Sequence, residues 1–326
     1  MYYFCTYFNI NYLSRGLALY HSMKENIDFT LYVLCLDEVT YELLNKMQLE
    51  NIILIKLVEI EAAYPELLDI KKTRSTIEYY FTCSPVLPLY IFDKFNQVDR
   101  ISYVDADLYF FSGVDKLFKE ISDSSIAVVE HRFHSMKKKN LRYGRFNVGI
   151  VSFRRDEQGI KCLEKWKGQC IDWCYDSLEE DRFADQKYLD EWPKLFDNLV
   201  IIQNKGVNLA PWNAGGSKLS LNGANLMVNN NDLIFYHFHG LKRFGDRRWD
   251  SGLGYYLVRC AGVIRESIYK PYINQLLQIE SELAQKYRLE VPRNKMRPPL
   301  NNGLFSKLSY YLQFLIRIIL WNYIKI

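Results

Sequence analysis

The N-terminal part of the chain alternates continuous apolar runs with segments of helical spacing, and this alternation constrains the fold more than any other feature. Apolar runs at Tyr2–Tyr7, Phe29–Leu36 and Asn51–Val58 predict three strands. Apolar residues three and four positions apart predict helices over Asn11–Lys24 and Val39–Leu49. Because strands without polar alternation are buried on both faces, this order predicts a parallel α/β sheet covered by helices. Ligands of such sheets bind beyond the carboxyl ends of the strands.

Later segments extend the α/β pattern. A helix is predicted over Glu78–Phe95, interrupted by two prolines, since proline removes a backbone donor from a helix interior. Further strands are predicted at Arg100–Val104, Phe146–Phe153 and Val200–Gln203. We therefore expect one Rossmann-like domain over residues 1–250, with a mostly parallel central sheet flanked by helices.

Composition excludes several other classes of protein. The 42 Lys and Arg against 38 Asp and Glu leave a net charge of only +4, which argues against a nucleic-acid partner. The seven cysteines are scattered, odd in number and free of any CxxC pair, so they predict buried thiols and a reducing cytoplasmic location. The N-terminus has no basic segment before its apolar run, so we do not expect a signal peptide.

The C-terminal part of the chain predicts three further segments. Residues 251–290 are expected to form a helical extension, and the Pro-, Asn- and base-rich residues 291–303 a linker. Residues 304–326 are apolar with scattered basic and aromatic side chains, which predicts an amphipathic tail helix. Such a helix is expected to lie on the inner membrane surface, or alternatively to dock on the body of the protein or in a dimer interface.

A pair of carboxylates follows the strand predicted at Arg100–Val104. Asp105 and Asp107 are separated only by an alanine, and burying two like charges costs several kcal/mol unless a cation compensates them. A divalent metal at the carboxyl end of the strand would do so, because Mg²⁺ prefers a few carboxylates together with substrate phosphates. The alternative is a solvated acidic turn.

Four motifs in order resemble a known enzyme group. YVDADLYFF around Asp105 resembles the DxD motif of GT-A glycosyltransferases, and FNVGIVSF at Phe146–Phe153 resembles the FNxG strand of glycogenin-like and lipopolysaccharide galactosyltransferase-like enzymes. FADQKYLDEW at Phe183–Trp192 and FYHFHGLK at Phe235–Lys242 resemble their DQ and HFxG motifs. The resemblance covers about residues 1–250. The chain also resembles bacterial sugar transferases that build surface polysaccharides.

The resemblance implies roles for individual residues. Metal ligands for Mn²⁺ or Mg²⁺ are implied at Asp105, Asp107 and His237. Contacts to the nucleobase, ribose or phosphates of the donor are implied at Thr6, Tyr7, Asn11, Asp37, Arg74, Asp105 and Lys242. The spacing to Lys242 is one residue shorter than in the family, and Arg243 is its alternative. Residues beside the anomeric carbon are implied at Asn147, Asp185 and Gln186, while Trp212 and Asn213 are expected at the acceptor or in the core.

The implied activity is transfer of a sugar from a nucleotide-diphosphate donor, and the donor expected first is a UDP-sugar. The acceptor is expected to be a glycan or a lipid-linked glycan of a bacterial surface polysaccharide, and the anomeric configuration is expected to be retained. If the configuration is inverted, Asp185 or Glu130 is the expected base. The alternatives are a sugar-phosphate nucleotidyltransferase, which usually has a Gly-rich N-terminal loop that this chain lacks, and a glycan-binding protein without activity.

Overall fold

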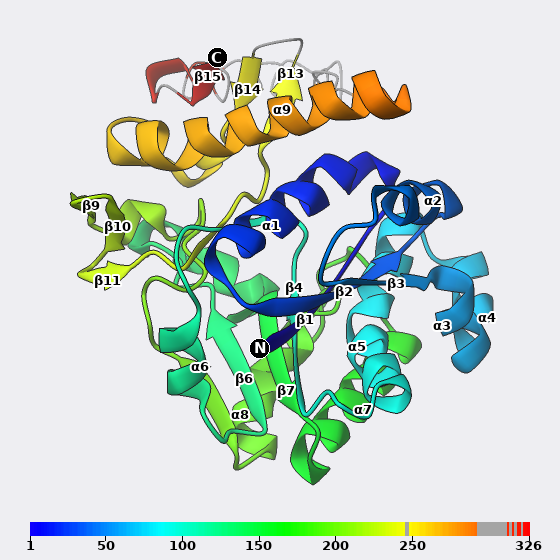
Figure 1. The fold of residues 1–326 in the computed structure, drawn as a ribbon. Helices are drawn as coiled ribbons and strands as arrows, with labels where there is room; N and C mark the ends of the chain where they lie inside the picture. Colours follow the sequence, from blue (N-terminus) through cyan, green and yellow to red (C-terminus); the bar gives the residue numbers. More distant parts are fainter. Residues whose placement is uncertain (245–247, 292–311, 313–314, 316–317, 321) are drawn as a thin grey trace.

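A computed structural model describes residues 1–244, 248–291, 312, 315, 318–320 and 322–326. Its centre is a seven-stranded sheet with the strand order β3-β2-β1-β4-β7-β6-β8 (Figure 1). The strands are β1 Tyr2–Phe8, β2 Phe29–Cys35, β3 Ile52–Lys56, β4 Arg100–Val104, β6 Ile126–Glu130, β7 Phe146–Arg154 and β8 Leu199–Ile202. Neighbouring strands of this sheet are parallel, except that β7 runs antiparallel to both β4 and β6. The predicted fold class, a mostly parallel sheet flanked by helices with a C-terminal helix, is confirmed.

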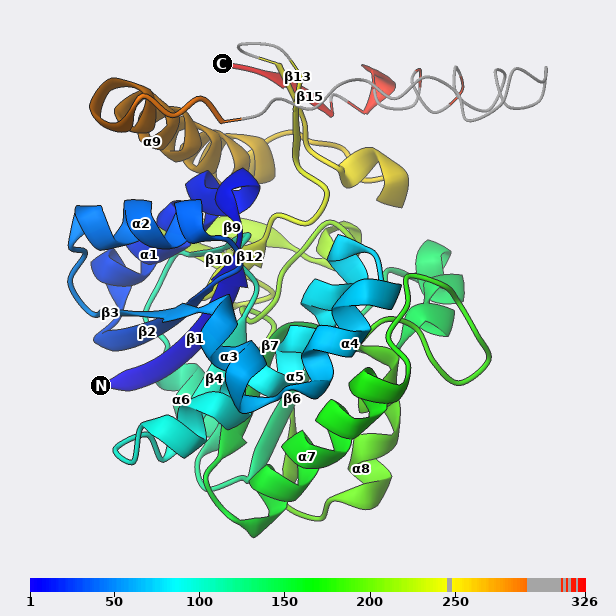
Figure 2. The ribbon, with the colours of Figure 1, turned by 90° about the vertical axis from the view of Figure 1, so that its right-hand side faces the viewer.

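Helices cover both faces of this sheet and create two apolar cores. The first core lies under α1 Leu13–Asn26, α2 Glu38–Met47 and α6 Asp115–Ile121. The second lies under α3 Leu57–Ala63, α4 Glu66–Thr73, α5 Thr76–Lys94, α7 Glu157–Asp172 and α8 Trp192–Leu195, several of which Figure 2 shows together. Along β1 the side chains alternate between the cores, with Phe4 and Phe8 in the first and Cys5 in the second.

Local sequence explains where several helices begin. Asp37 caps α2 by accepting a 2.7 Å hydrogen bond from the backbone nitrogen of Thr40, and Asp156 caps α7 in the same way. Helix α5 begins with a capping box of Ser75 and Glu78 and continues unbroken through its two internal prolines. The predicted interruption of this helix is therefore wrong, because burial of most of its side chains offsets the backbone hydrogen bonds that proline removes.

Several smaller elements lie outside the seven-stranded sheet. Strand β5 Leu108–Phe110 pairs with β12 Phe235–His237, and β9 Leu219–Asn222, β10 Asn225–Val228 and β11 Asn231–Asp232 form a second small sheet. Short 3-10 helices span Ile10–Tyr12, Ser135–Tyr143, Lys187–Glu191, Ala214–Gly216 and Leu253–Tyr256, and a π-helical turn spans Ile264–Tyr269.

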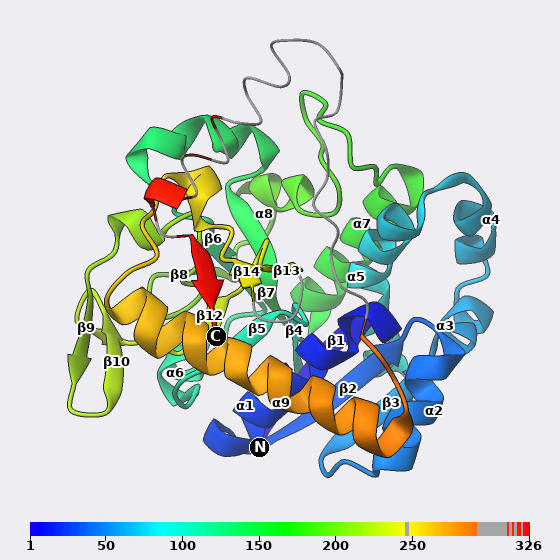
Figure 3. The ribbon, with the colours of Figure 1, turned by 90° about the horizontal axis from the view of Figure 1, so that it is seen from above.

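The C-terminal part packs directly on the α/β domain. Helix α9 Lys270–Tyr287 crosses α1 (Figure 3), and its buried side chains belong to the first core. Strands β13 Lys242–Phe244, β14 Arg248–Asp250 and β15 Tyr323–Lys325 form a third small sheet. None of the helices in the described part of the chain is both long and apolar enough to cross a membrane.

The predicted tail helix does not extend to residue 326. Residues 323–325 form β15, which pairs with β14 so that Ile324 lies opposite Trp249. Ile324 is fully buried, and Asn322 accepts a 2.6 Å hydrogen bond from Ser251 just before the strand, so tertiary contacts override helical spacing here. The predicted linker, apart from residue 291, and most of the predicted tail helix lie outside the described residues.

Candidate metal centre

Two short strands bring distant residues together beyond β4. Asp105 and Asp107 follow the end of β4, and the chain then continues into β5. Strand β12 pairs with β5 so that His237 lies opposite Leu108, the residue after Asp107. The backbone nitrogen of Phe238 also donates a 3.0 Å hydrogen bond to the carbonyl oxygen of Asp107. The pairing therefore fixes the histidine beside both carboxylates.

The three side chains form a compact donor set. Nε2 of His237 lies 3.1 Å from Oδ1 of Asp107 and 3.6 Å from Oδ2 of Asp105, and one ligand atom from each residue falls within 4.8 Å of the others. Two carboxylates and one imidazole are sound ligands for Mn²⁺ and, with phosphate oxygens, for Mg²⁺. The predicted metal residues are thus brought together, and their chemistry fits a divalent cation.

The electrostatics of the two carboxylates differ. Burial raises the pKa of Asp105, and the neighbouring Asp107 adds to this although His237 opposes it. Burial also works against ionisation of Asp107, but the charge and hydrogen bond of His237, together with Arg15, outweigh it and hold the pKa of Asp107 at about 2. A bound cation would offset the repulsion between the two carboxylates, and it would therefore favour ionisation of both.

Asp185 lies in the same electrostatic environment. Its side chain is hydrogen-bonded to Ser84, and its backbone carbonyl accepts a 2.8 Å hydrogen bond from the indole of Trp166. Burial raises the pKa of Asp185 to about 7, and the charge of Asp105 contributes in the same direction. The preceding residue, Ala184, has a φ of 47°, a left-handed conformation that is costly for a residue with a Cβ. The chain therefore accepts strain at the position that presents Asp185.

A hydrogen-bonded network connects Asp185 with the metal ligands. Ser84 on α5 shares a 3.0 Å hydrogen bond with the hydroxyl of Tyr7, and Tyr7 is in turn hydrogen-bonded to Tyr103. The hydroxyl of Tyr103 donates a 2.9 Å hydrogen bond to Oδ1 of Asp105. The sequence offered no signal for Ser84 or Tyr103, because each lies inside an element that reads as ordinary core.

The raised pKa of Asp185 predicts a pH-dependent change in stability. Because the folded chain holds this proton more tightly than the unfolded chain does, the contribution of Asp185 to stability falls as the pH rises from about 4 to about 7. Asp185→Asn has no carboxylate to ionise, so we expect this variant to keep the stability that the wild type loses. In EDTA its free energy of unfolding should exceed that of the wild type by at most about 4 kcal/mol at pH 7, and by little at pH 4. Urea unfolding at both pH values measures the difference. Asp181→Asn, at an exposed acid, is the control, and an equal gain at both pH values in Asp185→Asn would contradict the assignment.

Asn147 lies at an irregularity of β7. Val128 and Val129 of β6 pair with Val151 and Asn147, so the intervening residues of β7 form a bulge that contains Gly149. Oδ1 of Asn147 accepts hydrogen bonds from the nitrogen of Gly149, at 3.0 Å, and from Nδ2 of Asn208, at 3.1 Å. A Cβ on Gly149 would lie 2.8 Å from Nδ1 of His237. The bulge therefore carries Asn147 to the metal centre, and only glycine fits beside it.

Aromatic rings surround the histidine of the metal centre. The ring of Trp212 makes edge contacts with His131, His237 and His239, at centroid distances of 5.2, 5.0 and 5.5 Å. His131 was not predicted; it is buried, and Nδ2 of Asn147 lies 3.4 Å from its Nε2. Trp212 is itself only 3% exposed, so its role in this structure is to pack the histidines.

The residues expected at the nucleotide occupy different environments. Asn11 is exposed near the end of β1 and Tyr7 is half-buried there, whereas the side chain of Thr6 is fully buried. Asp37 follows β2, but its oxygens already accept hydrogen bonds from the backbone nitrogens of Ile10, at 2.9 Å, and Thr40. These positions share the carboxyl edge of the sheet with Asp105, and a nucleotide contact by any of them stays a prediction.

The two cations expected at the donor, Arg74 and Lys242, differ in their exposure and contacts. The guanidinium of Arg74 is 8% exposed and donates to Thr82 and to the carbonyls of Cys170 and Ile171, which ties α5 to the end of α7. These contacts give Arg74 a structural role in this state of the chain. Lys242 on β13 is exposed and acts electrostatically on His239, near the metal centre.

Two further positions complete the predicted set. Arg243, the alternative to Lys242, is paired with Glu280 and covers the ring of Trp249, so it supports α9. Gln186 donates a 2.9 Å hydrogen bond to the carbonyl of Tyr143, which anchors it beside the loop that precedes β7. Arg15 was not predicted, although its charge acts on Asp107 and its guanidinium donates to the carbonyl of Leu241.

Comparison with solved structures finds several glycosyltransferases. The chain is similar to the galactosyltransferase LgtC in complex with donor and acceptor sugar analogues, with 14% identity, a TM-score of 0.47 and coverage of 73% of this chain and 87% of that one. Mouse xyloside xylosyltransferase 1 matches with 12% identity, a TM-score of 0.47 and coverage of 73% and 98%. The glycosyltransferase GlyE of Streptococcus pneumoniae TIGR4 matches with 14% identity, a TM-score of 0.47 and coverage of 92% and 67%. Each of these matches is a likeness of fold at low sequence identity.

Comparison of sequences finds two bacterial relatives. No protein-family model matches it. The uncharacterized protein YfnD of Bacillus subtilis (strain 168) is 29% identical over 88% of this chain and 92% of its own length. The uncharacterized protein YfnF of the same organism is 32% identical over 73% of this chain and 81% of its own length. At that identity and coverage, the chain belongs to the family of YfnF.

Proposed function

We propose that the chain is a metal-dependent glycosyltransferase that takes a sugar from a nucleotide-diphosphate donor, a UDP-sugar in first place. The observation that carries this proposal is the position of Asp105, Asp107 and His237. They lie beyond the carboxyl end of β4, next to β1, where the strand order of the sheet reverses. Ligands of open α/β sheets bind at such a reversal, and a metal held there by two carboxylates keeps positions for diphosphate oxygens.

The bound metal would supply a Lewis acid that stabilises negative charge on the departing nucleoside diphosphate. The chain itself would contribute further positive charge through Arg15 and Lys242, both of which act electrostatically on residues of the metal centre. Asp185, held by Ser84, and Asn147, held by Gly149 and Asn208, would fix polar groups beside the donor sugar.

Retention of the anomeric configuration is part of the proposal. An inverting enzyme needs a carboxylate that takes a proton from the acceptor hydroxyl. Glu130 is paired with Arg145, at 2.5 Å between Oε1 and Nε, and Asp185 is 6% exposed and hydrogen-bonded to Ser84. Each carboxylate already has a partner within the chain, which supports retention. Proton NMR coupling constants of the first product formed would distinguish the two outcomes.

The acceptor is proposed to be a glycan or lipid-linked glycan of a bacterial surface polysaccharide, made at the cytoplasmic side of the inner membrane. Leu312, Leu315, Ile318 and Ile319 are between 48% and 69% exposed, and an apolar group of this kind suits contact with lipid. The seven cysteines are all free and buried, which suits a reducing compartment.

Turnover of a panel of donors tests the proposed reaction. The purified chain with Mn²⁺ is expected to release UDP from at least one UDP-sugar, and EDTA is expected to abolish the release. GDP-mannose and dTDP-glucose serve as alternative donors. Formation of pyrophosphate from UTP and glucose 1-phosphate would instead identify a nucleotidyltransferase, and no turnover of any donor would favour a glycan-binding protein.

A further inference from the structure

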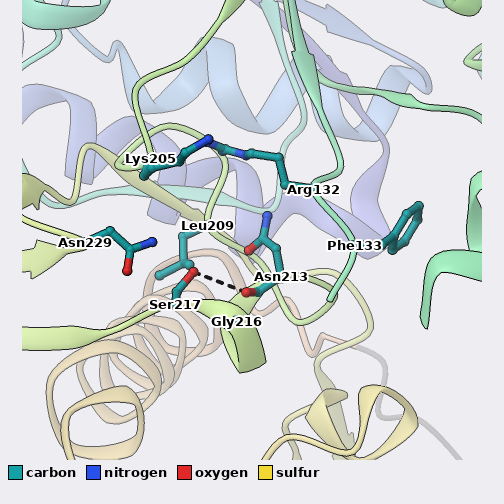
Figure 4. Close-up of a pocket in the computed structure, with 8 residues that line it drawn as sticks. All are labelled: Arg132, Phe133, Lys205, Leu209, Asn213, Gly216, Ser217 and Asn229. Atoms are coloured by element: carbon teal, nitrogen blue, oxygen red, sulfur yellow. Dashed lines mark hydrogen bonds between the residues drawn. The ribbon is translucent and has the colours of Figure 1, made fainter. Parts of the chain in front are cut away.

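A pocket of about 250 Å³ lies beside the metal centre, and its lining includes Asn213, which the sequence placed at the acceptor or in the core (Figure 4). Leu209 connects the two, because its carbonyl accepts a 2.8 Å hydrogen bond from the backbone nitrogen of the metal ligand His237 while the residue lines the pocket. Phe133, at the other end, stacks on His131 at a centroid distance of 4.6 Å. The pocket is slightly smaller than the roughly 300–1,000 Å³ typical of sites for drug-sized ligands, so it suits a small group such as one sugar unit.

The pocket is lined by two cations without a carboxylate partner. Arg132 and Lys205 extend toward one another along one side of it in Figure 4. In the described part of the chain, no acidic oxygen lies within 4.0 Å of a side-chain nitrogen of either residue. Burial lowers the pKa of Arg132 to about 10, although the more distant charges of Glu130 and Glu120 act in the opposite direction, and its guanidinium stays charged at neutral pH. Two cations at one small pocket favour an anionic ligand.

The surroundings of the two cations are fixed in place. The guanidinium of Arg132 donates to the carbonyls of Asn204, at 3.0 Å, and Val207, so it pins the backbone on both sides of Lys205. A Cβ on Gly206 would lie 1.8 Å from the carbonyl oxygen of Asp232, which shows how tightly this loop packs. Lys205 is itself exposed. Because the loop that carries it is tightly packed, its ammonium is presented from a rigid backbone.

The remaining lining is of the kind that recognises sugars. Asn213 is locked because its Nδ2 donates to the carbonyls of His131 and Asn208 and its Oδ1 accepts from the nitrogen of Ala210. The amide of Asn229 points into the pocket in Figure 4, and Phe133 supplies an aromatic ring. The amide of Asn229 and the aromatic surface provide hydrogen bonding and apolar contact for a pyranose ring, while Asn213, whose two N–H groups are taken, fixes the shape of the lining.

We propose that this pocket binds an acceptor saccharide that carries a negatively charged substituent, a carboxylate or a phosphate. The inference rests on the proposed glycosyltransferase function, because it makes the pocket the acceptor side of the same metal centre. It names the chemistry that the acceptor must have and assigns its recognition to Lys205 and Arg132.

Binding of matched sugars to the full chain tests this inference. Ligand-observed NMR titrations with Mn²⁺ and UDP present would compare methyl β-glucuronide, glucose 6-phosphate, neutral methyl β-glucoside and inorganic phosphate. We expect at least one anionic sugar to bind about tenfold or more tightly than the neutral glucoside, and Lys205→Ala to remove most of that preference. Lys194→Ala, at an exposed lysine of α8 outside the pocket lining, is the matched control and is expected to change nothing.

Three results would overturn the inference. The first is equal binding of the neutral and anionic sugars, and the second is the same behaviour in Lys205→Ala and Lys194→Ala. The third is binding of inorganic phosphate as tight as that of glucose 6-phosphate, which would identify a free-anion site. Nucleotide binding in the same samples separates this failure from failure of the proposed function. If no nucleotide binds with Mn²⁺ but Lys205 still selects anionic sugars, the pocket is a saccharide site and its acceptor role is wrong.

Discussion

Replacing Asp107 with asparagine is expected to lower the rate of sugar transfer by about 1,000-fold or more, which corresponds to about 4 kcal/mol of transition-state stabilisation. Asparagine keeps the shape of the side chain but removes the carboxylate, whose pKa of about 2 shows that it is ionised throughout the physiological range. The affinity for Mn²⁺, measured by electron paramagnetic resonance of the free ion, is expected to fall by about 100-fold or more.

The matched control for this variant is Asp69→Asn. Asp69 is exposed and forms an i,i+3 pair with Lys72, so its loss is expected to leave both Mn²⁺ binding and transfer unchanged. Circular dichroism in EDTA would verify that both variants are folded. If Asp107→Asn retained wild-type Mn²⁺ affinity and rate, the Asp-Asp-His assignment would be wrong.

The second large effect is expected at Gly149. Alanine there would place its Cβ 2.4 Å from Oδ1 of Asn147, 2.8 Å from Nδ1 of His237 and 3.2 Å from Oδ1 of Asn208. These atoms are buried, so at least one side chain must move, and overpacking of this kind costs about 1–3 kcal/mol. Displacement of His237 from the two carboxylates is expected to weaken Mn²⁺ binding by about tenfold or more.

Gly168→Ala is the control for this substitution because nothing lies within 4 Å of the position of its Cβ. Gly168 lies in α7, where alanine is expected to raise stability by about 0.5–1 kcal/mol. Gly149 is absent from the residues with positive φ, so its substitution tests steric fit alone. Thermal unfolding and Mn²⁺ titration of the two variants make the comparison. Equal behaviour of Gly149→Ala and Gly168→Ala would show that the bulge of β7 does not hold the metal centre.

The central sheet could be predicted because its signal is local. The runs that became β1 and β2 are apolar throughout, and the intervening segment has helical spacing that became α1. The end of the chain could not be predicted in this way. Tyr323–Lys325 is a strand only because β14 offers a partner and Trp249 a cross-strand contact, and pairing between distant segments is not visible in local spacing.

The metal centre was predicted from motifs, whereas its supporting residues were not. Asp105 and Asp107 stand out because two acids follow a buried strand, but His131 and Asn208 lie in segments without a recognisable pattern. Asn208 has a φ of 61° and reaches Asn147 only because β7 bulges at Gly149. Arg74 could not be judged from sequence either: its Nη atoms donate to Thr82 and to the backbone carbonyls of Cys170 and Ile171, and a contact with the donor stays a prediction.

The central claim is that Asp105, Asp107 and His237 bind a divalent metal that in turn binds a nucleoside diphosphate. Thermal unfolding of the wild-type chain with UDP, GDP, dTDP or CMP, each with and without Mn²⁺, tests it most directly. A ligand at about 100 times its Kd adds about 2.7 kcal/mol of stability, which raises the midpoint by several degrees. We predict that UDP raises the midpoint only when Mn²⁺ is present. An equal shift by UDP in EDTA, or no shift by any of the four nucleotides, would contradict the account.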